Sequence, residues 1–134
     1  MGTLSGVPAT QDSTDIPVIA SSVIAGSGVV ANAVATATMA AMPTVTAYIT
    51  GFQITAGGAT AAKIVAAALS GVAGGTVSYV FGFPAGVTTA ALNLAVTFYP
   101  AIPASGPNTA IALSLPAGGS GNTAAAVSVQ GFYL

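Results

Sequence analysis

The fold of this chain is decided by residues 76–99, which read TVSYVFGFPAGVTTAALNLAVTFY. In both halves of this stretch apolar side chains alternate with polar or small ones, and Pro84-Ala85-Gly86 separates the halves. A period of two residues is typical of a β-strand with one buried face. We therefore predict a strand on each side of the break. The inward faces of these strands consist of Val77, Tyr79, Phe81 and Phe83, and of Leu92, Leu94, Val96 and Phe98.

The same pattern of short apolar runs between turns continues over most of the chain. The runs cover residues 29–39, 44–55, 61–70, 76–83, 89–99, 109–115 and 123–134, and residues 16–25 offer a first strand. Many short strands at regular spacing favour a sandwich or a barrel, so we expect an all-β fold. Ile111, Leu113 and Leu115 complete the predicted core faces.

The sequence also predicts where an N-terminal arm ends and the folded domain begins. Residues 1–28 begin with a polar stretch that has no periodic apolar face, so we expect an extended N-terminal arm, followed by a β-domain over residues 29–134.

Residues 60–69, TAAKIVAAAL, leave two structures open. Alanine is the best helix former, which favours a short helix, whereas the surrounding turns favour a strand.

Charge is almost absent from the sequence. Only three of 134 residues are charged, namely Lys63, Asp12 and Asp15. Soluble domains usually contain about 25% charged residues, against 2% here. The chain has no histidine or cysteine, which excludes disulfides and thiolate metal sites. We expect no enzyme activity, no catalytic, cofactor or metal site, and no basic surface for nucleic acid.

The mean hydropathy of +0.89 raises the alternative of a membrane protein. A spanning helix needs about 20 consecutive apolar residues. Here the longest stretch without a polar residue, glycine or proline is residues 64–69. We therefore expect no membrane segment. Disorder is also disfavoured, because disordered chains are rich in charge and poor in apolar residues.

The candidate site residues are contacts with a partner. Lys63 is expected on an exposed face or in an ion pair with a neighbouring chain, because a catalytic lysine needs a desolvated pocket. The two aspartates lie in the arm and are expected to be solvated or to touch a partner. The chain also ends in apolar residues, which we expect to dock on the body or on a subunit. The predicted partner contacts are Val7, Pro8, Gln11, Asp12, Asp15, Ile16, Phe132, Tyr133 and Leu134.

An uncharged surface favours association, and uncharged strand edges lack the residues that normally prevent edge pairing. A symmetric oligomer of a closed β-fold buries the uncharged surface and the uncharged strand edges. We therefore expect a homo-oligomer.

Three segments carry a resemblance to a known family: TAYITGFQITAGGATAA (46–62), VFGFPAGVTTAALNLAVTFYPAIPAS (80–105) and PNTAIALSLPAGGSGNTAAAVSVQGFYL (107–134). Together they resemble the small jelly-roll proteins that decorate or cement the capsids of tailed bacteriophages. The resemblance implies an antiparallel eight-stranded jelly-roll sandwich, often a homotrimer, on the outer surface of the virion. It also implies that the arm contacts the major capsid protein and that the protein stabilises contacts between capsomers.

Two other functions fit the same sequence. One is a receptor- or glycan-binding fibre or spike module of a virion, which would need an exposed pocket of converging polar groups. The other is a self-assembling surface-layer or fimbrial protein, built by strand exchange between subunits.

Overall fold

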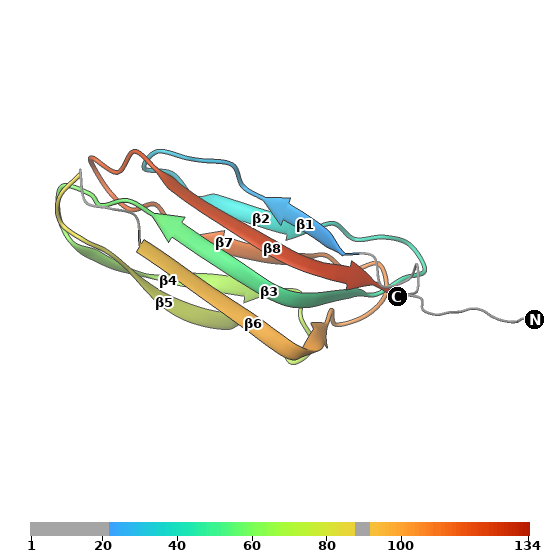
Figure 1. Cartoon of the computed structure of the whole chain (residues 1–134). Coiled ribbons are helices and arrows are strands. Elements are labelled where there is room, and N and C mark those ends of the chain that lie inside the picture. Colours follow the sequence, from blue (N-terminus) through green and yellow to red (C-terminus); the bar gives the residue numbers. More distant parts are fainter. Residues whose placement is uncertain (1–21, 88–91) are drawn as a thin grey trace, which may run out of the picture.

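The computed structural model describes residues 22–87 and 92–134, and Figure 1 shows them as two stacked layers of strands. The described part contains eight strands: β1 (Val23–Gly26), β2 (Ala35–Met39), β3 (Ala47–Ala56), β4 (Lys63–Ser70), β5 (Val77–Phe83), β6 (Leu92–Pro103), β7 (Ile111–Leu115) and β8 (Ala125–Tyr133). No described residue belongs to a helix long and apolar enough to cross a membrane.

The strands form two four-stranded sheets with the connectivity of a jelly roll. The front sheet has the order β1-β8-β3-β6 and the back sheet the order β2-β7-β4-β5. Every pairing is antiparallel, and β1 pairs with β8, β2 with β7, β3 with β6, and β4 with β5. The first four strands thus pair with the last four as one long hairpin that rolls up into two layers. This confirms the predicted antiparallel eight-stranded sandwich.

The predicted inward faces are buried in the middle of the sheets and are only partly covered on the two edge strands β5 and β6. Ile111, Leu113 and Leu115 of β7 have no exposed surface. In the edge strand β5, Phe81 and Phe83 are buried and Val77 is 43% exposed. Along the other edge strand, β6, the inward side chains are half-buried and Leu92 is 42% exposed. A strand with a neighbour on one side only covers its inner face incompletely.

Most of the segment that the sequence left open, residues 63–69, belongs to strand β4. This strand pairs with β5 and β7 and buries Val65, Ala67 and Leu69 with a period of two. Pairing on both sides therefore overrides the helix propensity of alanine.

The folded body also begins earlier than residue 29. Strand β1 lies within the range 1–28 that the sequence assigned to the arm, yet it pairs with β8 through Val23 and Gly131. Residues 1–21 lie outside the described part of the chain.

The two long sides of the sandwich differ in the size of their core side chains. On the alanine side, formed by β1 and β2, Ala35 and Ala37 are buried, and Cα atoms of β2 and β8 come within 8 Å of each other although they belong to different sheets. Facing sheets usually lie about 10 Å apart. On the aromatic side, where β5 and β6 are the edge strands, the ring of Phe52 in β3 meets that of Tyr79 in β5 edge to face at 4.8 Å. Small residues thus draw the sheets together on one side, and rings hold them apart on the other.

The loops gather at the two ends of the sandwich. At the end that we call the loop end, Ala59 donates its N–H to the Pro84 carbonyl (3.0 Å) and Thr60 to that of Ser120 (2.8 Å), which ties three loops together. At the opposite end, the terminal end, Thr46 N–H donates to the Leu134 carbonyl (2.7 Å). Val23 lies beside Gly131 near the end of β8, so the chain enters the body at the terminal end.

Substitution of one buried and one exposed methionine tests which side chains form the core. Met39 in β2 is 1% exposed, whereas Met42 in the following loop is 45% exposed. We expect Met39→Ala to lower the free energy of unfolding by about 2–5 kcal/mol, because it leaves a cavity between the sheets. The matched change Met42→Ala should alter it by less than about 0.5 kcal/mol. Urea unfolding at one fixed protein concentration measures both, and equal effects would contradict the assigned core.

Candidate functional site

Charged side chains are scarce among the described residues. Lys63 is their one charged side chain, and its ammonium donates a hydrogen bond to the Ala117 carbonyl (3.0 Å) while remaining exposed. No group of three or more potential metal-ligating side chains occurs in the described part. Lys63 thus lies on an exposed face of the described body.

The structure places three of the nine predicted contact residues. Phe132, Tyr133 and Leu134 lie at the terminal end, where β8 runs between β1 and β3. The other six, which are Val7, Pro8, Gln11, Asp12, Asp15 and Ile16, lie outside the described residues. Leu134 is 49% exposed, although its backbone N–H and carbonyl both bond to Thr46. The backbone of Leu134 is therefore fixed to the body, while its side chain remains half-exposed.

Phe132 and Tyr133 point to opposite faces of the front sheet. The ring of Phe132 stacks on that of Tyr48 in β3, with centroids 5.2 Å apart and planes inclined by 10°. Tyr133 donates its hydroxyl to the Ala40 carbonyl in the β2–β3 loop (2.7 Å). Burial raises the pKa of Tyr133 above its usual value, because the ionised phenolate would lose part of its hydration. Tyr133 thus holds a loop, and Phe132 belongs to an aromatic pair.

The outer face of the front sheet carries neutral amides and hydroxyls. Gln53 donates its amide to the Asn93 side-chain oxygen (3.0 Å) across β3 and β6. Beside this pair lies a shallow hollow of about 120 Å³, lined by residues that include Thr97 and Gln130. A Cβ atom at Gly51 would stand 2.8 Å from the Val96 carbonyl oxygen and 3.3 Å from the Gln130 amide nitrogen. Glycine at this position therefore leaves room for the Gln130 side chain to lie over the sheet.

The loop end depends on Asn122, a residue that sequence reasoning missed. Asn122 is 2% exposed, and its amide donates to the carbonyls of Gly57 (3.2 Å), Gly58 (3.3 Å) and Ala124 (3.3 Å). Its oxygen accepts the N–H of Asn32 (3.4 Å). In the sequence, Asn122 reads as one more turn residue in a glycine-rich loop, so no signal distinguished it. Its buried amide joins three loops.

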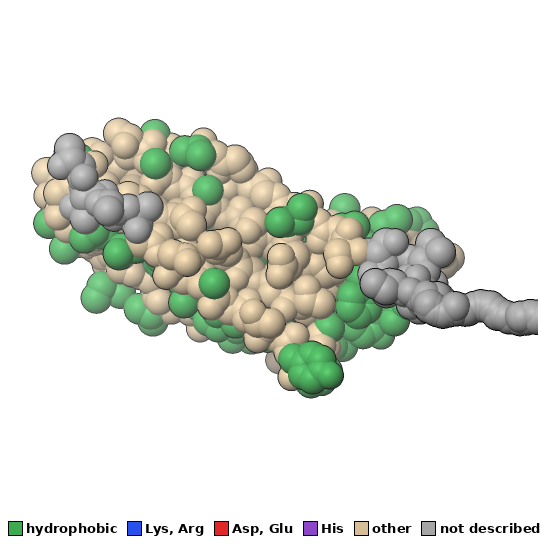
Figure 2. Space-filling model, viewed as in Figure 1, with side chains coloured by type: hydrophobic (Ala, Val, Ile, Leu, Met, Phe, Trp, Pro, Cys, Tyr) green, Lys and Arg blue, Asp and Glu red, His purple; other side chains and the backbone are tan. Residues whose placement is uncertain are grey.

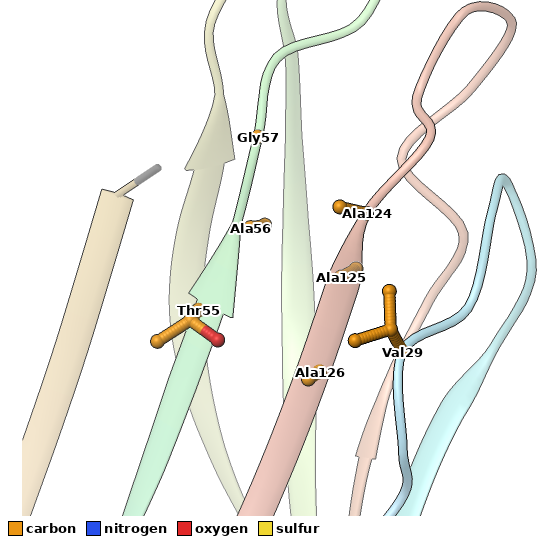
Figure 3. A pocket seen from close by; sticks show the side chains of 7 residues that line it. All are labelled: Val29, Thr55, Ala56, Gly57, Ala124, Ala125 and Ala126. Atoms are coloured by element: carbon orange, nitrogen blue, oxygen red, sulfur yellow. The ribbon is translucent and has the colours of Figure 1, made fainter. Parts of the chain in front are cut away.

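Two further depressions lie at the loop end. The larger, about 310 Å³, is lined by Lys63 and neighbouring residues of the β3–β4 and β7–β8 loops. The smaller, about 80 Å³, is the crevice of Figure 3, where Val29 faces the small side chains at the ends of β3 and β8. Thr55 supplies the one side-chain oxygen of this crevice, so its lining is almost entirely apolar.

The exposed surface combines neutrality with apolar side chains. Figure 2 shows the front sheet covered by neutral polar and hydrophobic side chains, with no charged one in view. Twelve large hydrophobic side chains of the described part are exposed. They are Val23, Ile24, Val29, Val34, Met42, Ile64, Val77, Val80, Val87, Leu92, Tyr99 and Leu134. Tyr99 is the extreme case at 98%. The exposed surface of the described residues is therefore neutral and partly apolar.

Comparison of the chain with family models, with curated proteins and with solved structures gives no match.

The hydrogen bond of Tyr133 gives a prediction for stability. We expect Tyr133→Phe to lower the free energy of unfolding by about 1 kcal/mol, because the Ala40 carbonyl loses its donor. Tyr99→Phe is the matched control, since no side-chain hydrogen bond holds that exposed ring, and it should leave the free energy unchanged.

The pH dependence of the same bond follows from the raised pKa. Folding favours the neutral hydroxyl, so its contribution is complete below about pH 10, the pKa of an unfolded tyrosine, and is lost as the pH rises through the higher pKa of the folded state. Urea unfolding of both proteins at neutral and alkaline pH should show the difference between wild type and Tyr133→Phe shrinking in alkali. A difference that grows there would contradict this assignment.

Proposed function

We propose that the protein is a structural component of a virion. It binds the outside of a bacteriophage capsid as a homo-oligomer, most simply a trimer, and cements adjoining capsomers. The observation that carries the proposal is the neutral, partly apolar exterior of a compact jelly roll, on which Lys63 is the single charge of the described residues. A monomer with this surface is poorly protected against association, whereas a subunit held in an assembly needs no such protection.

The start of the described body supports attachment through the terminal end. Val23, the first residue of β1, lies beside Gly131 near the end of β8 and so at the same end as Phe132 and Leu134. The predicted arm contacts, among them Val7, Asp12 and Ile16, precede β1 in the sequence and lie outside the described residues. In the proposed arrangement the major capsid protein meets that end, and the jelly roll stands on it as a rigid body.

Attachment in this proposal rests on apolar burial and neutral hydrogen bonds. Salt screens interactions between charges and leaves the burial of apolar surface largely intact or strengthens it. Because Lys63 is the one charged side chain of the described body, ionic strength should have little effect on the strength of attachment.

One observation favours a glycan-binding module as the second candidate. The front sheet combines the Gln53–Asn93 amide pair, the hollow beside Gln130 and the stacked rings of Tyr48 and Phe132. Neutral amides suit hydroxyl groups, because one amide both donates and accepts hydrogen bonds. Copy number separates the two candidates, since a cement protein is present in hundreds of copies and a spike in few.

We predict that the protein binds shells that lack it, and that the bound amount is the same at about 0.15 M and about 1 M NaCl. Co-sedimentation with purified shells, followed by quantification of bound copies, measures both. The double change Val7→Asp with Ile16→Asp should weaken binding at least about tenfold, because it places charges in an apolar contact. The double change Asp12→Asn with Asp15→Asn is its matched control in the same arm. Release by salt alone, or a stoichiometry of only a few copies per shell, would refute the proposal.

A further inference from the structure

Eight of the twelve exposed large hydrophobic side chains lie along the two long sides of the sandwich. On the alanine side, at β1, β2 and the loop between them, they are Val23, Ile24, Val29 and Val34. On the aromatic side, at β5 and β6, they are Val77, Val80, Leu92 and Tyr99. These sides are opposite, because β1 and β6 are the two edges of the front sheet, and β2 and β5 those of the back sheet (Figure 1).

Both sides also end in strands without an outer neighbour among the described residues. Strand β6 is the longest of these edges, with 12 residues, and β1 has 4. None of the four edge strands contains a charged residue, because Lys63 lies in β4. Edge strands are normally protected by charges, so these edges are suited to being covered.

Tyr99 marks the aromatic side most clearly. In β6 the register with β3 jumps from the pair Gly51–Thr97 to the pair Ile49–Ile102, so four residues of β6 bulge between them. Tyr99 lies in this bulge with 98% of its surface exposed and no ring partner among the described aromatics. Tyrosine is enriched among the residues that contribute most to binding at the centre of protein interfaces.

The length of the sides suits a subunit interface. On the aromatic side the 12-residue strand β6 spans about 40 Å, and two sheets about 10 Å apart with their outer side chains are about 20 Å thick, so this side has an area on the order of 800 Å². That area equals the share that one partner contributes to a standard interface. The edge strands of the alanine side are shorter, with 4 residues in β1 and 5 in β2, but the contact of this edge with β8 continues beyond β1 to the bridge between Val30 and Ala125. A second copy also matches the chemistry, because its own sides are uncharged and leave no charge buried without a partner.

Two different apolar sides favour a head-to-tail contact over a two-fold one. In a two-fold dimer each copy uses one side against itself, which leaves the other side of both copies exposed. In a closed ring the aromatic side of each copy meets the alanine side of the next, and every copy has both sides covered.

We propose that the aromatic side of one copy, around Tyr99 and Val80, packs on the alanine side of the next copy, around Ile24 and Val34, and that this contact closes the ring. The inference rests on the proposed homo-oligomer and names the surfaces that form it.

Two single substitutions test the pairing of the sides. Tyr99→Lys and Ile24→Lys place a charge on exposed positions of the aromatic and the alanine side, respectively, where the native side chains are 98% and 72% exposed. Each should raise the dissociation constant of the oligomer by roughly 100-fold or more, so that each variant alone sediments as a monomer. Met42→Lys, in the β2–β3 loop at the terminal end, is the matched control and should remain oligomeric.

Mixing the two variants gives the decisive result. Each retains the side that the other has lost, so the equimolar mixture should form a one-to-one dimer that cannot close into a ring. Sedimentation velocity on separately labelled proteins measures this dimer. Circular dichroism and the urea midpoint check folding, and Val80→Lys with Val34→Lys replaces the first pair if either variant unfolds.

Three results would overturn the inference. If one variant stays oligomeric alone, the contact joins one side with itself. If both variants are monomeric and do not bind each other when mixed, the two sides are not partners. If both variants stay oligomeric alone, the contact lies elsewhere. A monomeric wild type instead refutes the proposed homo-oligomer itself, so failure of the inference and failure of the function give different outcomes.

Discussion

Apolar packing between two sheets is the interaction on which this structure depends. The chain has no cysteine, and the described residues contain one charge, so disulfides are excluded and ion pairs within that part have no basis. What remains is the burial of side chains such as Ile49, Ile54 and Leu113, together with the backbone ladders that join the strands. The core tapers from alanine at β2 to aromatic rings at β5 and β6. The same taper closes one side of the sandwich and leaves the other partly open.

That open side connects the interior with the proposed function. The half-buried rings of Tyr79 and Phe98 belong to the core, yet they lie next to unpaired strand edges and to the exposed Tyr99. A solvated protein would cover such edges with charge. Here the neutral exterior, the long uncharged edge of β6 and the two apolar sides all suit a subunit whose neighbours complete its surface. Cementing a shell requires rigidity and contact area rather than reactive groups, and this fold supplies both.

The sequence predicted the parts of the fold that depend on local alternation. It identified the inward faces of β5, β6 and β7 and the all-β sandwich, because a half-buried strand must alternate. It did not decide the structure of residues 63–70, where alanine favours a helix in isolation and only pairing with β5 and β7 selects a strand. It offered a first strand over residues 16–25 but assigned that run to the arm, whereas β1 pairs with β8 and belongs to the body. The exposure of Tyr99 and the role of Asn122 depend on the three-dimensional position of a bulge and of three loops, which no local pattern encodes.

The central claim is that this neutral jelly roll works only among copies of itself. Native mass spectrometry of the full chain, sprayed at low micromolar concentration from a solution of moderate salt, tests that claim directly. The account predicts a folded species whose mass is a fixed multiple of 12.6 kDa, with three copies as the expected number. A folded species of single-chain mass that persists as the concentration rises would contradict it.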